Sequence, residues 1–247
     1  RIRTFYSRRI GDISGGGKVL GTHGGWSFAA LSARSNLQDS NDRAHYTVAR
    51  VRRDVATRSN IGFTLANRSQ DGRQQGSIEV DTSLFFTDTF GFTGQFVKSY
   101  GQHETGTVAF FARPSYDSAT AHAHVRFTYL GDRVADNINA IGFIRDDDRR
   151  EIDSAASKTF WIRSGPLERL RYNSNYNIYW GQTGTLRSWK VDESLEFDWR
   201  NRWSTAVSHT EEFKQYEKDF RNRQTEMEIG YNTRSYQSVR GGYSFGQ

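Results

Sequence analysis

Apolar and charged residues alternate along this chain in a pattern that recurs from end to end. Residues 121–129 read Ala-His-Ala-His-Val-Arg-Phe-Thr-Tyr, so the odd-numbered positions are apolar and the even-numbered positions are polar or charged. We call each such set of alternate positions a parity. The same period of two recurs at 78–84, 195–200 and 226–231. Successive side chains of a β-strand point to opposite faces, so the pattern predicts strands with one apolar and one charged face. That combination is typical of a transmembrane β-barrel, which has lipid outside and water inside.

The composition is unusual for a soluble domain of this length. Only 35% of the 247 residues are hydrophobic, whereas soluble domains usually contain about 45–50%. A barrel with an aqueous lumen accounts for this shortage, because only its outer band must be apolar. Aromatic residues make up 14% of the chain and there are only two prolines. Both values suit uninterrupted strands with aromatic girdles at the membrane interfaces.

Several classes of protein are disfavoured by simple counts. The chain has no cysteine, which excludes disulfides and cysteine-ligated metals and fits a bacterial envelope protein. The longest purely apolar run, 108–112, is far shorter than the ~20 residues of a membrane helix. The net charge is +6, but basic residues are interleaved with acidic ones, so we expect no nucleic-acid partner. The chain begins at Arg1 without a visible signal peptide, and we interpret it as a processed or truncated piece.

Turn-forming residues divide the chain into about fourteen or fifteen expected strands. No linker or shift of composition appears, so we expect one β-barrel domain over 1–247. The predicted fold class is all-β, an antiparallel transmembrane β-barrel of about 14 or more strands, either complete or part of a larger barrel. The expected strands are 15–23, 25–34, 43–54, 58–68, 76–86, 89–99, 105–114, 119–130, 136–145, 157–166, 169–181, 184–200, 202–212, 222–232 and 235–245.

The expected connections differ in length. Gly24-Gly25 and Thr87-Asp88 suit short turns, and 67–72, 101–102 and 131–132 also carry turn residues. The charged stretches 146–151 and 211–221 predict longer loops, and this mixture resembles periplasmic turns and external loops.

Two segments are ambiguous. Residues 210–228 have aromatic residues at helical spacing, so a polar helix is the alternative to strands there. Within 46–51 the apolar residues change parity, which indicates a bulge or a misplaced boundary.

A family signature is carried by residues 5–11, 16–21, 25–26, 48–54, 59–62 and 141–146. These segments resemble the "domain of unknown function 5916" family of bacterial outer-membrane proteins. The resemblance implies a large outer-membrane barrel, usually preceded by a carbohydrate-binding-like sandwich domain that is absent here, and it implies no particular activity. The family's barrel is longer than this chain. Either these strands close on themselves, or further protein completes the barrel, because hydrocarbon does not permit unpaired strand edges.

Motifs that suggest catalysis or ligand binding fail on spacing or context. Residues 242–246 match G-x-S-x-G, but a nucleophile elbow needs a following helix and triad partners. Residues 15–18 lack the spacing of a phosphate loop, and 146–148 lack the glycine of a calcium-binding EF-hand loop. His122 and His124 share one strand face, yet a metal site would need further ligands from elsewhere. We therefore predict no catalytic residue, cofactor or metal.

The charged parity supplies the candidate functional residues. Its acidic members could pair for glycoside hydrolysis, and the six tryptophans could stack sugars, but a lumen wall and interface anchoring explain them more simply. The residues expected to face lipid are Val80, Val125, Phe127, Phe197 and Ile229. The residues expected to face the lumen are Glu79, Asp81, His122, His124, Arg126, Glu196, Asp198, Arg200, Glu226 and Glu228.

These features predict a barrel of the bacterial outer membrane that acts as a pore, or as an anchor and conduit for partner domains. Its expected partners are the lipid bilayer with lipopolysaccharide, and further protein that completes or plugs the barrel. Two alternatives remain open. One is an outer-membrane enzyme with a His or carboxylate site at the lumen or rim, and the other is a soluble β protein that binds glycans through tryptophans.

Overall fold

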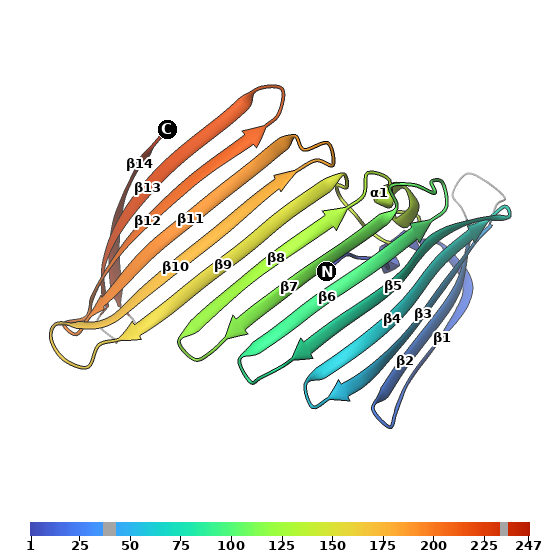
Figure 1. Ribbon diagram of the computed structural model, residues 1–247, viewed down its shortest axis with the longest axis horizontal. Coiled ribbons are helices and arrows are strands. Elements are labelled where there is room, and N and C mark those ends of the chain that lie inside the picture. The colour runs from blue at the N-terminus through green and yellow to red at the C-terminus, as the bar shows by residue number, and fades with distance from the viewer. Residues whose placement is uncertain (37–42, 233–236) are drawn as a thin grey trace. The chain divides into compact units, whose positions relative to one another are not determined.

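The computed structural model describes residues 1–36, 43–232 and 237–247, and most of these residues are in β-strands (Figure 1). The only helical elements among them are a 3-10 turn, η1 (Ser7–Arg9), and one short helix, α1 (Val134–Ile138). The strands are β1 (Ile13–His23), β2 (Trp26–Asn36), β3 (Arg43–Ala56), β4 (Ser59–Gln70), β5 (Arg73–Phe85), β6 (Phe90–Tyr100), β7 (Val108–Asp117), β8 (Ala121–Leu130), β9 (Arg149–Trp161), β10 (Leu167–Trp180), β11 (Leu186–Trp199), β12 (Trp203–Gln215), β13 (Asp219–Asn232) and β14 (Ser238–Gly246).

The fourteen strands form one antiparallel sheet in sequence order, from β1 to β14. The predicted all-β antiparallel fold is thereby confirmed. In the described part of the chain the sheet is not closed, because β1 and β14 each have only one neighbouring strand. The chain divides into two compact units, which are described separately below. The N-terminal unit comprises 1–113 and 127–150, and the C-terminal unit comprises 114–126 and 151–247.

Two of the expected strands are wrong or displaced. Residues 136–145 form no strand, because α1 and a loop occupy this part of the chain. Two pairs of apolar residues there, Ile138 with Ala140 and Ile141 with Phe143, have the spacing of a strand. Ile138, Ile141 and Ile144 are buried because this segment packs on one face of the sheet. The strand expected at 157–166 is β9, which begins earlier, at Arg149, and ends at Trp161.

The segment 210–228 is a hairpin and not a helix. Strands β12 and β13 pair in register, for example through Phe213 and Arg221. Of the aromatic residues at helical spacing, Phe213 and Phe220 lie on these strands and Tyr216 lies in the turn between them. The long loop expected at 211–221 shrinks accordingly to the turn between Gln215 and Asp219. The short turn at Gly24-Gly25 is as expected, and both residues have positive φ values, of 54° and 77°. Glycine adopts such angles without a steric cost.

The parity change within 46–51 involves neither a bulge nor a boundary. Strands β3 and β4 stay in register from His45 to Asp54. Tyr46 and Val48 lie on the parity that is polar elsewhere because they pack in an apolar cluster with Phe5 and other residues. The change of parity therefore indicates that apolar residues cover this part of the sheet, while the backbone of β3 stays regular.

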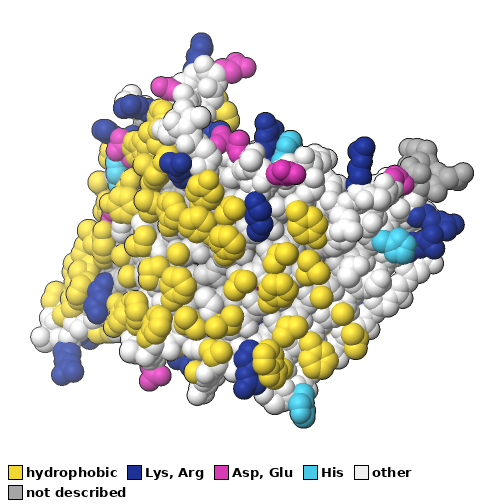
Figure 2. Space-filling model, turned by 45° about the vertical axis from the view of Figure 1, so that its right-hand side comes forward, with side chains coloured by type: hydrophobic (Ala, Val, Ile, Leu, Met, Phe, Trp, Pro, Cys, Tyr) yellow, Lys and Arg dark blue, Asp and Glu magenta, His cyan; other side chains and the backbone are white. Residues whose placement is uncertain are grey.

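Burial on the N-terminal unit is the reverse of that in a water-soluble sheet. On β5, Ile78 and Val80 are 42% and 45% exposed, whereas the intervening Glu79 and Asp81 are 5% and 1% exposed. We call the side that carries Ile78 and Val80 the apolar face, and the other side the polar face. Figure 2 shows one side of the molecule, on which hydrophobic side chains spread widely and most acidic side chains lie near the margins.

Candidate functional site on the polar face

A buried cluster of charged side chains lies on the polar face of the N-terminal unit. Strand register brings its members together, since Arg50, Thr64 and Glu79 are successive cross-strand partners on β3, β4 and β5. Asp81 is paired in register with Gly62. We call Arg1, Thr4, Arg50, Glu79 and Asp81 the carboxylate cluster.

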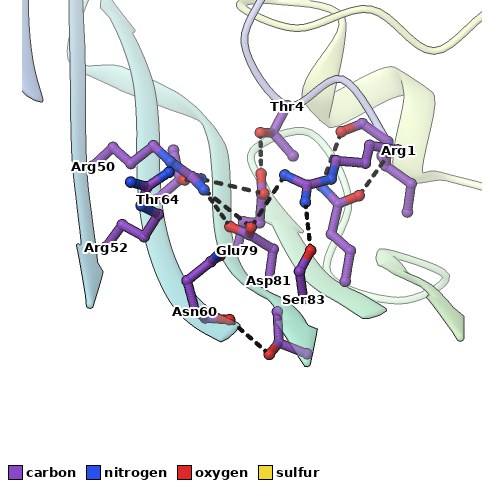
Figure 3. Close-up of polar contacts among 12 residues, drawn as sticks. Arg1, Thr4, Arg50, Arg52, Asn60, Thr64, Glu79, Asp81 and Ser83 are labelled. Carbon is purple, nitrogen blue, oxygen red and sulfur yellow. Dashed lines mark hydrogen bonds and ion pairs between the residues drawn. The ribbon is translucent and has the colours of Figure 1, made fainter. Parts of the chain in front are cut away.

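Arg50 holds both acidic residues of the cluster (Figure 3). Its Nη2 lies 2.8 Å from Asp81 Oδ2, and its Nη1 lies 3.8 Å from Glu79 Oε1. Nη1 also donates to Thr64 Oγ1 at 2.6 Å. The approach requires glycine at position 62, because a Cβ there would lie 2.6 Å from Asp81 Oδ2 and 2.7 Å from Arg50 Nη2. Such charge-assisted bonds are what make a buried carboxylate tolerable.

The start of the chain supplies the other partners. Arg1 Nη1 lies 3.3 Å from Asp81 Oδ1, and Arg1 Nη2 donates to Ser83 Oγ at 3.2 Å. Asp81 therefore lies between two guanidinium groups, as Figure 3 shows. Thr4 Oγ1 donates to Glu79 Oε2. These contacts join residues that are 75 to 82 positions apart in the sequence.

Hydrogen bonds to the backbone hold the same segment in place. The side-chain amide of Gln95 binds the backbone of Ile2 twice, accepting from its N–H at 2.8 Å and donating to its carbonyl at 2.9 Å. Phe143 N donates to Arg3 O at 2.9 Å, and Tyr6 N donates to Ile141 O at 2.9 Å. The segment 1–6 is thus held both by the sheet and by the loop 131–148.

Two apolar clusters lie between these segments and the sheet. Together they pack apolar side chains of the loop 131–148 and of the N-terminal segment 1–12 against part of the polar face in this unit. The first cluster contains Val97, Ala109, Leu130, Val134, Ile138 and Ile144, with Ile2 packed against it. The second contains Ala33, Ala44, Tyr46, Ala66 and Ile141, with Phe5, Ile10 and Val48 packed against it. We call segments 1–12 and 131–148 the inner cover.

The predicted histidines lie together on β8 in the C-terminal unit. His122 Nδ1 lies 2.5 Å from Asp117 Oδ1, and His122 Nε2 lies 2.9 Å from His124 Nδ1. His124 Nε2 is 3.8 Å from Asp153 Oδ2 on β9. Arg126 follows on the same parity. Within the described residues, no group of three or more His, Asp or Glu side chains is arranged to hold a metal ion.

The remaining predicted lumen residues form cross-strand pairs in the C-terminal unit. Glu196 Oε2 lies 3.0 Å from Arg171 Nη1, and Asp198 pairs with Arg169. Glu228 is 3.8 Å from Arg240, and Glu226 lies in register between a serine of β12 and a serine of β14.

Arg200 has a different role from the other residues predicted to face the lumen. It follows the end of β11. Its guanidinium donates to the carbonyls of Ile162 and Gly165 in the turn between β9 and β10. Arg200 therefore links two neighbouring turns.

The residues predicted to face lipid are exposed or half-buried. Val80, Val125 and Ile229 are exposed. Phe127 is half-buried and packs against Phe110, and Phe197 is half-buried and stacks on Trp199. Residues 15–18 and 242–246, whose motifs were rejected, lie inside β1 and β14.

Sequence reasoning missed Arg1, Thr4, Arg50 and Gln95, which act on the two predicted carboxylates. No local motif marks them, because each contact spans many residues. A signal did exist in the apolar side chains that appear on the otherwise polar parity, such as Tyr46 and Val97. Their presence indicates that something other than water covers this part of the face.

No helix among the described residues is long and apolar enough to cross a membrane. Comparison of the chain with protein-family models, with curated proteins and with solved structures finds no match.

Proposed function

We propose that this chain forms the wall of a transmembrane β-barrel in the bacterial outer membrane. The observation that carries the proposal is the reversed burial in the N-terminal unit, where apolar side chains of the sheet are exposed and the carboxylates between them are covered. A soluble sheet would place its apolar face against a core. A membrane barrel places that face against lipid.

The exposed apolar side chains form continuous cross-strand rows. In the N-terminal unit, Phe28, Val51, Phe63, Val80 and Phe96 are successive partners from β2 to β6. All five are between 42% and 51% exposed. A row this long is an extended apolar surface of the kind that marks a membrane or protein contact.

A similar row crosses the C-terminal unit. Leu195, Val207, Met227 and Tyr243 are partners from β11 to β14, and all four are exposed. The sheet has unpaired edges at β1 and β14, which lipid would not permit. The proposed barrel is therefore closed in the membrane, either by these two strands or by further protein. The resemblance to the outer-membrane family supports the same location.

The inner cover supports a plugged barrel that anchors or conducts partner segments more than it supports an open pore. In the N-terminal unit the side chains that would line an aqueous channel bind the chain's own residues, as Asp81 and Glu79 bind Arg1 and Thr4. The polar face of the C-terminal unit carries half-exposed ion pairs, which suit contact with water.

A matched pair of substitutions on β12 tests membrane insertion. Val207 lies in the apolar row, whereas its neighbour Ser208 lies on the polar parity between Ser194 and Glu226. Val207→Arg should cost about 2–4 kcal/mol of stability in lipid vesicles, the range known for arginine on the lipid face near the bilayer centre. Ser208→Arg should cost little, because the new cation would face Glu226 and water.

The measurement is urea-induced unfolding of the chain after it has folded into vesicles, followed by tryptophan fluorescence. Equal tolerance of arginine at both positions would refute the assignment of faces. A wild-type chain that folds in buffer, stays soluble there and does not bind vesicles would refute membrane insertion itself.

A further inference from the structure

A pocket of about 440 Å³ lies at one end of the C-terminal unit. It is formed where β9, β11 and β13 end and where β10, β12 and β14 begin. Three tryptophans and three arginines stand in its wall, namely Trp161, Trp199, Trp203, Arg169, Arg202 and Arg240. Its volume is within the ~300–1,000 Å³ typical of small-molecule sites. The pocket shares no residue with the carboxylate cluster.

The wall offers flat apolar surfaces beside hydrogen-bond donors. Trp161 and Trp203 are 59% and 43% exposed, and the Trp203 ring lies 5.1 Å from that of Tyr231. The guanidinium carbon of Arg169 lies 5.6 Å from the Trp161 ring centroid. An aromatic face next to a guanidinium can contact the C–H side of a ring and a polar substituent at once.

Small residues keep the floor of the pocket open. Ser204 and Gly230 are cross-strand partners that both line it. A Cβ at position 230 would lie only 2.8 Å from Ser204 Oγ. Larger side chains at these two positions would therefore reduce the space between the aromatic and basic walls.

Arg202 has a backbone conformation that arginine rarely adopts. Its φ is 74°, and it ends the three-residue turn between β11 and β12. Glycine or asparagine is usual at such a position, because a larger side chain crowds the backbone. The backbone is held on both sides, since Arg202 N donates to Trp199 O at 3.0 Å and Asn232 N donates to Arg202 O at 3.1 Å. Glycine would form this turn with less strain, so the arginine side chain contributes something other than turn geometry.

We propose that this pocket binds a saccharide that carries a carboxylate or phosphate group. The tryptophan faces suit a sugar ring, and guanidinium groups suit a planar or tetrahedral anion through paired hydrogen bonds. The wall holds Arg169, Arg202 and Arg240 beside Glu168 and Asp198. Arg169 pairs with Asp198 and Arg240 lies 3.8 Å from Glu228, but a guanidinium group carries five N–H donors, more than one such pair occupies. Because all lining residues belong to one unit, the site does not depend on membrane insertion.

The test uses the full chain folded in detergent micelles, with tryptophan fluorescence as the readout. Glucuronate, glucose 6-phosphate, glucose and inorganic phosphate are titrated separately. We expect a saturable change with at least one of the two anionic sugars, and affinity at least tenfold weaker for glucose and for inorganic phosphate. Equal affinity for glucose, or no response to either anionic sugar from a chain that circular dichroism shows to be folded, would overturn the proposal.

Two variants of Arg202 and one control sharpen the test. Arg202→Gly should weaken binding of the anionic sugar at least tenfold in a chain that circular dichroism shows to be folded. Arg202→Gln removes the charge and keeps the side-chain length, so it should weaken binding as well. The control is Arg163→Gln, which removes an exposed charge from the neighbouring turn without touching the pocket. Equal weakening by Arg163→Gln and Arg202→Gln would show diffuse charge attraction and would overturn the assignment of the site.

Discussion

Asp81→Asn should release the start of the chain from the sheet. The Asp81 side chain is 0% exposed, whereas its partners Arg50 and Arg1 are 33% and 50% exposed. Removing one member of a fully buried ion pair costs about 3–5 kcal/mol. Here both guanidinium groups retain water contact after the change, and asparagine still accepts a hydrogen bond. We therefore expect a loss of about 1–3 kcal/mol, close to one or two hydrogen bonds to a charged group.

Two measurements on the folded chain in micelles check this prediction. Urea-induced unfolding gives the free energy, and amide hydrogen exchange reports on Phe143 and Tyr6, whose N–H groups bind Arg3 and Ile141. Both amides should exchange faster in Asp81→Asn, because Arg1 no longer holds the segment that carries these bonds.

The matched control for Asp81→Asn is Asp54→Asn. Asp54 forms an exposed pair with Arg52 at 3.7 Å, so its loss should cost no more than about 0.5 kcal/mol. If both variants lose the same stability, or if the two amides keep their protection in Asp81→Asn, the carboxylate cluster does not anchor the N-terminal segment.

Three further changes have defined outcomes. Gly62→Ala should destabilise the chain by about 1–3 kcal/mol in urea unfolding, because its Cβ would overlap Asp81. In lipid vesicles Val125→Arg should cost about 2–4 kcal/mol whereas His124→Ser costs little, and similar losses would contradict the assigned faces. Burial raises the pKa of Asp147 in the loop after β8. The folded state therefore binds its proton more tightly, and stability from this group is present at low pH and is lost as pH rises through the folded pKa. The free energy of unfolding should fall as pH rises through the folded pKa of Asp147, and an Asp147→Asn variant should lack this decrease.

Local patterns were sufficient to predict most of the strands, since alternation and turn residues act over a few positions. They failed at 136–145, where Ile138 and Ala140, and then Ile141 and Phe143, are two positions apart as in a strand. Ile138 instead ends a helix of only five residues, and the others follow it in a loop. A helix this short shows too few turns for its period to appear in the sequence. Its position depends on long-range packing against β5 and β6.

Alternation places the charged residues of a strand on one face, but charge alone does not say what contacts that face. Glu79 and Asp81 bind the chain's own N-terminal segment and are buried, whereas Glu196 and Asp198 pair across strands and stay half-exposed. Both sets alternate with apolar residues in the same way. The distinction lies in the neighbours, because the first set shares its face with buried apolar side chains such as Val97.

This difference bears on how the proposed barrel would work. A carboxylate that lies between two guanidinium groups under a protein cover is poorly placed to attract a passing solute, since its charge is already compensated. Half-exposed pairs such as Arg171 with Glu196 retain contact with water and can act on solutes electrostatically. In the proposed barrel the N-terminal unit would therefore hold the inner cover in place. Any contact with solutes would fall to the polar face of the C-terminal unit, where small residues such as Ser208 and Ser194 face each other in register.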